Sequence, residues 1–259
     1  MQLHFLGTGG FHPSESRHTA CLMLPELGLV FDAGTAAFRI PQHLVTDELT
    51  ILLSHAHLDH ICGLTYLLVP LLDGRLRRIV VRSTAETLTA VREHLFSERV
   101  FPLLPENLVW EPLVHGEQLE LHDRWTVEVH QLVSHPGGSL GFRLDHRSDA
   151  VRQHLLAYIT DTTVDGTYDD FVRGVPLLIH ECYFPDSGTD WALKTGHSST
   201  GMVAELAART GVGEVVLVHV DPLSTGVDPL DLPSFRRVFP KGRLACDGDR
   251  LTIRESAAQ

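Results

Sequence analysis

The chain has 259 residues, near the upper end of what a single domain reaches, and it can bury a substantial core. Its 21 Lys and Arg against 33 Asp and Glu give a formal charge of −12, which argues against binding nucleic acid through a diffuse basic surface. The four cysteines form no CxxC pair, which disfavours disulfide and cysteine-rich zinc frameworks and favours a reducing cytoplasm. No apolar stretch is long enough to span a membrane, and we expect no signal peptide because strand-like residues 3–6 open the chain.

Strands and helices are expected along the whole chain. Short strands are predicted at 3–6, 20–24 and 29–31, then a buried strand at 49–53, a helix at 58–72 and a strand at 79–81. A helix at 85–96, capped by Ser83 or Thr84, precedes a meander of strands over about 108–144. Buried strands follow at 155–160, 177–180 and 215–219, with a helix at 198–209 closed by Gly211 and a final hairpin at 244–253. No linker divides residues 1–259, so the pattern predicts one α/β domain with packed sheets covered by helices.

One motif stands out among the 17 histidines, the H-x-H-x-D-H run from His55 to His60. His55 and His57 alternate in an extended segment after a buried strand, so both imidazoles point the same way. Asp59 and His60 then project toward a neighbouring point as the chain turns into a helix. Two pairs of nitrogen and oxygen ligands a few ångströms apart suit a dinuclear zinc or manganese site. Because composition yields this pattern by chance only about 0.005 times per chain, a solvated histidine-rich loop is the weaker interpretation.

Further ligands are expected at the ends of predicted strands. His135 follows a strand, and Asp161 and His219 each end a buried strand. A polar residue at such a position is usually an ordinary strand cap. Together with the histidine-rich motif, however, the three would give two metal ions three protein ligands each and one shared carboxylate.

Other motifs follow one another in a fixed order. They are Leu6-Gly7-Thr8-Gly9-Gly10, Phe31-Asp32-Ala33-Gly34, the run from His135 to Leu144, Thr160-Asp161-Thr162, His180-Glu181-Cys182-Tyr183-Phe184, Gly196-His197-Ser198-Ser199 and Leu217-Val218-His219. With the H-x-H-x-D-H run, they resemble the ribonuclease Z-like branch of the metallo-β-lactamase superfamily over nearly the whole chain. The resemblance implies a single-domain, four-layer αββα sandwich and a cytoplasmic, metal-dependent hydrolase. It also implies a possible homodimer.

The resemblance further implies a ligand set for two divalent metal ions, with zinc as the first choice and manganese or iron as alternatives. His55, His57 and His135 would hold one ion, Asp59, His60 and His219 the other, and Asp161 would bridge the two. Relatives that open β-lactams usually carry cysteine where this chain has Asp161. An aspartate there suits phosphodiester, thioester or lactone hydrolysis better.

Several other residues receive a candidate role. Asp32 either orients a ligand imidazole or caps a strand. Asp59 would also accept a proton, His197 would act as general acid, and Glu181 would orient His197 or pair on the surface. Ser198 and Ser199 are predicted helix caps and possible phosphate donors, at a helix N-terminus that favours phosphate. His12 and His18 lie in a Gly-, Pro- and Ser-containing loop that could rim the site, although a solvated loop is the simpler interpretation.

The predicted function is a phosphodiesterase acting on a small nucleotide, a cyclic phosphate or a short RNA, with no membrane partner and no strong nucleic-acid surface. Ribonuclease Z enzymes that process the 3′ end of tRNA carry a long basic arm between the motifs that match His135 and Asp161, which here lie only 26 positions apart. Processing of tRNA is therefore an alternative rather than the first choice. A lactone or thioester hydrolase and a non-enzymatic binding module also stay open. The extra cysteine-based zinc site of arm-less cyclic-phosphate diesterases is not evident near Cys21.

Overall fold

The structure is a computed structural model that describes residues 1–122, 124–147, 152–224 and 226–254. The chain divides into two compact units, each built around one sheet. Unit 1 consists of Met1–Val114 and Cys246–Ile253, and unit 2 contains His115–Ala245 and the C-terminal segment. Two mixed sheets with helices agree with the predicted α/β class, whereas the assignment of residues 1–259 to one domain stays a prediction.

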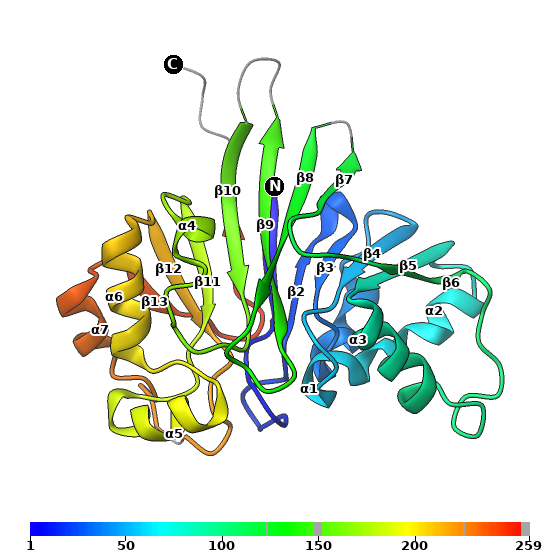
Figure 1. Cartoon of the computed structure of the whole chain (residues 1–259). Coiled ribbons are helices and arrows are strands. Elements are labelled where there is room, and N and C mark those ends of the chain that lie inside the picture. The colour runs from blue at the N-terminus through cyan, green and yellow to red at the C-terminus, as the bar shows by residue number, and fades with distance from the viewer. Residues whose placement is uncertain (123, 148–151, 225, 255–259) are drawn as a thin grey trace. The chain divides into compact units, whose positions relative to one another are not determined.

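Unit 1 contains a seven-stranded sheet in the order β14-β1-β2-β3-β4-β5-β6 (Figure 1). Its strands are β1 (Gln2–Gly7), β2 (Cys21–Leu24), β3 (Leu29–Phe31), β4 (Glu48–Leu52), β5 (Arg78–Ser83), β6 (Leu108–Pro112) and β14 (Arg250–Thr252). Its helices are η1 (Pro25–Leu27), η2 (Thr35–Gln42), α1 (Leu58–Ile61), η3 (Cys62–Leu67), α2 (Leu68–Leu72), α3 (Ala85–Ala90) and η4 (Val91–Leu95). Alternate strand residues such as Val30, Ile51 and Val81 form one buried cluster with helix residues such as Leu64 and Val91. The helices thus cover one face of this sheet.

The parallel part of this sheet positions the H-x-H-x-D-H motif. Strands β3, β4, β5 and β6 run parallel, and Phe31 pairs with Leu52 at the carboxyl ends of β3 and β4. Because parallel strands end at the same edge, the residues after β3 and after β4 lie next to each other. The amide of Asp32, which follows β3, donates to the Leu52 carbonyl at 2.9 Å. Side chains from two loops therefore meet at this edge.

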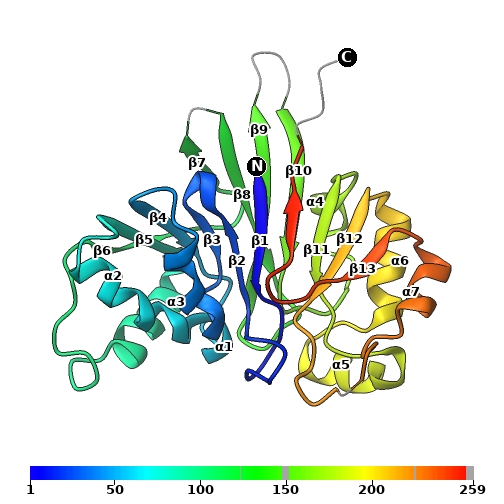
Figure 2. The same cartoon turned by 180° about the vertical axis from the view of Figure 1, so that it is seen from behind.

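Unit 2 contains a second seven-stranded sheet, in the order β13-β12-β11-β10-β9-β8-β7. Its strands are β7 (Gln118–His122), β8 (Trp125–Leu132), β9 (Ser139–Arg147), β10 (Arg152–Ile159), β11 (Leu177–Glu181), β12 (Glu214–Val218) and β13 (Gly242–Leu244). Its helices are α4 (Asp169–Val172), η5 (Asp186–Gly188), α5 (Thr189–Thr195), α6 (Thr200–Thr210) and α7 (Leu232–Val238). Figures 1 and 2 show α6 and α7 beside β12 and β13, and residues of both helices share a buried cluster with this end of the sheet.

Most of the predicted elements are present, with differences at their ends. The predicted helix at 58–72 consists of α1, η3 and α2 in succession, and the one at 85–96 ends in the short π-helix η4. Thr84 caps α3, because its side chain accepts a hydrogen bond from the Thr87 amide. Strand β6 is no part of a meander, since it pairs parallel with β5. Among the described residues, no helix is long and apolar enough to cross a bilayer.

The predicted hairpin at 244–253 is wrong. Strand β13 pairs parallel with β12 in unit 2, whereas β14 pairs antiparallel with β1 in unit 1. Figure 2 shows the red strand β14 beside the blue strand β1. The Asp-Gly turn has the local signature of a hairpin, but each strand finds its partner at the open edge of a different sheet.

Candidate metal centre

The histidine-rich motif of unit 1 forms a compact group of nitrogen and oxygen donors. It begins in the extended segment after β4 and ends in α1, with His57 at the N-cap position. The ring centroid of His55 lies 4.4 Å from that of His57 and 4.3 Å from that of His60, and Asp59 Oδ2 lies 3.4 Å from His60 Nε2. His55, Asp59 and His60 are buried, whereas His57 is exposed. The structure therefore brings all four predicted ligands of unit 1 together.

Asp32 makes the hydrogen bond expected of a residue that orients a ligand. Its carboxylate is fully buried, and Oδ2 lies 2.9 Å from Nδ1 of His60. It also accepts hydrogen bonds from the amide of Ser54 at 2.7 Å and from its hydroxyl at 3.0 Å. A proton on Nδ1 of His60 leaves the lone pair on Nε2 for a metal ion. Asp32 thus both fixes the imidazole and holds the loop, so the two predicted roles are compatible.

Unit 2 contributes a second group built around one carboxylate. His135 follows β8, Asp161 follows β10 and His219 follows β12, and all three side chains are buried. Asp161 Oδ1 lies 3.2 Å from Nε2 of His219, and Oδ2 lies 3.9 Å from Nε2 of His135. Each carboxylate oxygen therefore faces a different imidazole, as a carboxylate shared by two metal ions would. The carboxyl ends of parallel strands create this convergence, as the sequence predicted.

A glycine supports His135 from the other side of its ring. Nδ1 of His135 lies 3.0 Å from the carbonyl oxygen of Gly196, which ends α5 in a left-handed conformation with φ +76°. A Cβ atom at this position would lie 2.6 Å from Pro136 Cδ and 2.8 Å from the Cα atom of His135. Only glycine therefore lets the carbonyl reach the imidazole without displacing the loop.

His197 and Glu181 lie next to the ligands of unit 2. Glu181 Oε1 lies 3.4 Å from Nδ1 of His197 and also accepts the amides of Ser198 at 2.8 Å and Thr162 at 3.2 Å. Burial raises the pKa of Glu181, and the neighbouring His197 opposes this shift. Glu181 is fully buried, so the prediction that it could pair on the surface is wrong. The ring of His197 lies 5.0 Å from that of His135.

The two serines before α6 match their predicted roles only in part. The helix begins at Thr200, and Ser199 occupies its N-cap position without a capping hydrogen bond from its side chain. Ser198 is fully buried, and its hydroxyl donates to the Thr162 carbonyl at 2.7 Å. Because its hydroxyl proton already forms this hydrogen bond within unit 2, the arrangement gives no support to Ser198 as a hydrogen-bond donor to phosphate. Ser199 is also buried and accepts a hydrogen bond from Thr189.

The loop of His12 and His18 contains a site contact that the sequence did not predict. The amide of Phe11 donates to Asp59 Oδ2 at 2.8 Å, although nothing in the residue type suggests this role. His12 is exposed, and His18 is partly buried with Nδ1 3.2 Å from Thr35 Oγ1. The described contacts of His12 and His18 join neither imidazole to Asp59.

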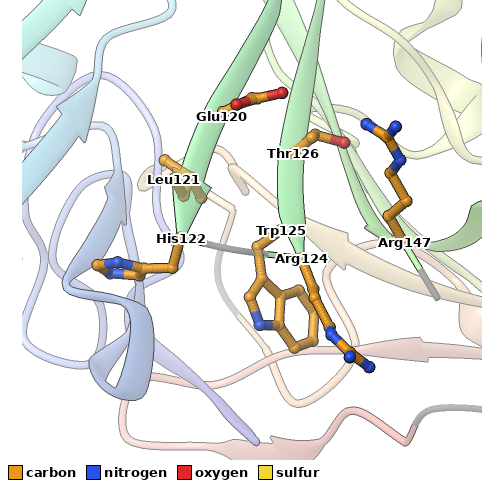
Figure 3. A pocket seen from close by; sticks show the side chains of 7 residues that line it. All are labelled: Glu120, Leu121, His122, Arg124, Trp125, Thr126 and Arg147. Carbon is orange, nitrogen blue, oxygen red and sulfur yellow. The ribbon is translucent and has the colours of Figure 1, made fainter. Parts of the chain in front are cut away.

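A cavity of about 320 Å³ lies at the other end of the unit 2 sheet (Figure 3). Its lining consists of Glu120, Leu121, His122, Arg124, Trp125, Thr126 and Arg147. Strand β9 begins near His135 and ends at Arg147, so the cavity and the ligand group occupy opposite ends of the same strands. None of the predicted site residues lines it.

Comparisons with known proteins establish the family. Residues 29–220 match the family model described as the beta-lactamase superfamily domain. The chain belongs to this superfamily. Ribonuclease Z of Bradyrhizobium sp. (strain ORS 278) is 26% identical, and the match covers 97% of this chain and 99% of that protein. These similarities confirm the predicted ribonuclease Z-like branch.

Solved structures share the fold over nearly the whole chain. The short form of human tRNase Z is 22% identical with a TM-score of 0.73, covering 98% of this chain and 100% of that chain. A diphosphatase from the PhnP family is 18% identical with a TM-score of 0.71, covering 98% of both chains. The predicted α/β metallo-β-lactamase fold is therefore confirmed, and its histidine and aspartate groups support divalent metal ions as cofactors.

Proposed function

We propose that the chain is a dinuclear-metal-dependent phosphodiesterase. Following the superfamily pattern, His55, His57 and His135 would hold one ion, and Asp59, His60 and His219 the other. Asp161 would bridge the two ions. The observation that carries this proposal is the Asp161 carboxylate, whose two oxygens face the Nε2 atoms of His219 and His135. Neutral imidazoles and carboxylates are donors that suit zinc, with manganese or iron as alternatives.

Residues around the ligands supply proton transfers to this chemistry. When bound, the ions would lower the pKa of a coordinated water and neutralise charge on the phosphate oxygens. Asp59 accepts the proton of the attacking water, while the Phe11 amide holds its Oδ2 atom in place. His197 donates a proton to the leaving oxygen, and Glu181, 3.4 Å from its Nδ1 atom, fixes the orientation of the ring.

The substrate is proposed to be small or flexible, such as a nucleotide, a cyclic phosphate or a short RNA. The described strands β9 and β10 are joined within residues 147–152, which leaves no room for a long arm. The alignment with the Bradyrhizobium ribonuclease Z spans 321 positions, 62 more than this chain has residues. With a net charge of −12, the chain also lacks the excess of cations that binding a folded RNA requires.

Processing of tRNA remains the second candidate, because ribonuclease Z relatives match over nearly their full length. A lactone or thioester hydrolase on the same ligands is the third, since an aspartate at position 161 is compatible with it. A cytoplasmic location and a homodimer are further proposals that rest on the resemblance.

The test compares substrate classes on protein loaded with zinc or manganese. We expect turnover of bis(p-nitrophenyl) phosphate, with weaker or no turnover of a lactone and a thioester. Asp161→Ala should abolish the turnover, whereas Asp145→Ala, a buried aspartate outside the site, should retain it in the folded fraction. Adding a precursor tRNA to the assay separates the first two candidates. Hydrolysis of the lactone or thioester alone would refute the phosphodiesterase proposal.

A further inference from the structure

Phe11 adopts a conformation that ordinary folding preferences disfavour. Its φ is +58°, in the left-handed region that bulky side chains rarely adopt. The residue is 66% exposed, so burial of its side chain does little to stabilise the loop. Strained residues of this kind persist where the surrounding structure holds them, and they concentrate at functional sites.

The backbone of Phe11 is held by a residue of the proposed metal centre. Its amide donates to Asp59 Oδ2 at 2.8 Å, and Asp59 is buried. The left-handed conformation therefore directs the N–H group at Asp59 while the ring stays in solvent. An aromatic surface is in this way fixed close to the carboxylate that is proposed to bind metal and accept a proton.

Asp247 holds both ends of the loop that carries Phe11. Its Oδ1 atom accepts hydrogen bonds from the amide of Thr8 at 3.0 Å and from its hydroxyl at 2.8 Å. Its Oδ2 atom accepts the amide of His18 at 2.7 Å and Nη1 of Arg39 at 2.7 Å. The Gly9 amide also donates to the His18 carbonyl at 2.9 Å, which closes the loop at its base. Both ends of the loop are thus held by hydrogen bonds, and the Phe11–His12 pair lies in its exposed part.

The two rings at this position form one aromatic surface. Their centroids lie 5.0 Å apart at an interplanar angle of 57°, and both side chains are exposed. Aromatic rings on a protein surface stack with nucleobases of any sequence. Among phosphodiesters of biological origin, nucleotides carry an aromatic base close to the reacting phosphate, so such a surface suits a nucleotide.

We propose that the Phe11 ring, with His12 beside it, contacts a nucleobase of the substrate, and that Asp247 positions this surface next to Asp59. This inference rests on the proposed phosphodiesterase function and narrows its substrate class to nucleotides. Sugar phosphates and alkyl phosphodiesters would lack the contact.

The experiment compares two esters that share the reacting phosphate and the leaving group. Thymidine 5′-(p-nitrophenyl phosphate) carries a nucleoside, whereas ethyl p-nitrophenyl phosphate does not. Phe11→Gly removes the ring, and glycine adopts a positive φ without strain, so the amide can still reach Asp59. We expect the ratio of kcat/KM for the nucleoside ester to that for the ethyl ester to fall by roughly 10-fold or more, the size of one lost stacking contact.

Thermal unfolding distinguishes this contact from a structural role. Relief of backbone strain should leave the Tm of Phe11→Gly unchanged or raise it by about 2–4 °C. Phe11→Trp should keep the nucleoside preference, and Leu72→Ala, an equally exposed apolar truncation in unit 1, should alter neither the ratio nor the Tm. An unchanged ratio in Phe11→Gly, or a lower Tm with equal losses on both esters, would overturn the proposal.

A double variant tests the role of Asp247. Asp247→Ala should reduce the nucleoside preference in the wild-type background but should cause no further reduction when Phe11→Gly is already present. Equal reductions in both backgrounds would show that Asp247 does not act through Phe11. If wild-type protein hydrolyses neither ester, the proposed function fails. Equilibrium dialysis with thymidine 5′-monophosphate then still tests the base contact. The proposal requires that Phe11→Gly binds this nucleotide more weakly than the wild-type protein does.

Discussion

Replacing Asp32 by asparagine tests whether this buried carboxylate sets the tautomer of a metal ligand. Asp32 accepts three hydrogen bonds, from the Ser54 amide, the Ser54 hydroxyl and Nδ1 of His60. Asparagine has nearly the same shape and tolerates the left-handed backbone at this position, where φ is +55°. It has only one acceptor oxygen, however, so its NH₂ group must face at least one of these donors.

The size of the effect follows from where the NH₂ group lies. If it replaces Oδ2, it can donate to Nδ1 of His60 only when the imidazole proton moves to Nε2, the atom proposed to bind metal. Loss of such an orienting partner typically costs 10- to 100-fold in metal affinity, or about 1.4–2.7 kcal/mol. If it replaces Oδ1, it faces the Ser54 amide and leaves a buried donor unsatisfied, at about 1–3 kcal/mol of folding free energy.

Urea unfolding with and without excess zinc separates the two effects. The zinc-dependent part of the unfolding free energy should be smaller in Asp32→Asn by the loss in binding free energy, about 1.4–2.7 kcal/mol. Asp145→Asn is the matched control, because Asp145 is equally buried in unit 2 but pairs with Arg152 and His154. It should destabilise the metal-free protein without changing the zinc-dependent part. Equal zinc-dependent stabilisation in wild type and Asp32→Asn would refute the argument.

Three further outcomes follow from the geometry of unit 2. Gly196→Ala and Gly211→Ala both place a side chain at positive φ, but only the Cβ atom at position 196 meets atoms closer than 3 Å. Metal titration should therefore show weaker binding in Gly196→Ala alone. The free energy of unfolding should fall by at least about 2 kcal/mol in Gly196→Ala and by about 1 kcal/mol in Gly211→Ala. His197→Gln should lower kcat by about 10²–10⁴-fold without changing the bound metal measured by elemental analysis, whereas a loss of metal would show that His197 is a ligand. Burial lowers the pKa of His180 to about 4, so the neutral ring stabilises the fold. The contribution of this neutral ring to the free energy of unfolding should be fully present above the unfolded-state pKa of about 6.5, and it should fall by about 3 kcal/mol as the pH drops toward 4. Denaturant titrations at several pH values should find this pH dependence reduced in His180→Gln.

The positions of the candidate metal ligands could be predicted from the sequence because local rules place them. Alternation in an extended segment places His55 and His57 on one side, and the following turn of helix supplies Asp59 and His60. Asp161 and His219 could be predicted because buried parallel strands end at a common edge. For the four residues of the H-x-H-x-D-H motif a short stretch of chain determines the direction of the side chain, whereas for Asp161 and His219 the sequence predicts only a position at the end of a strand.

Predictions failed where a choice between distant partners decides the structure. The turn at Asp247-Gly248 has the sequence of a hairpin, yet β13 and β14 pair with β12 and β1. Glu181 was equally plausible at the surface, because a charged residue at a strand end is usually solvated. Its Oε1 atom accepts hydrogen bonds from the amides of Thr162 and Ser198, which offset part of the cost of burying the carboxylate.

The contacts around Phe11 lay furthest from what sequence rules can predict. Asp247 and Thr8 are 239 positions apart, and Phe11 and Asp59 are 48 apart, so no local pattern links them. The residue type even argues against the conformation, since phenylalanine rarely adopts a positive φ. Asp32 and His219 share this left-handed backbone, and both lie at the ends of strands in the candidate metal centre. Local preference opposes this conformation most strongly at Phe11, so tertiary contacts must select it there, and a site that requires fixed donor directions is the physical reason to retain such strain.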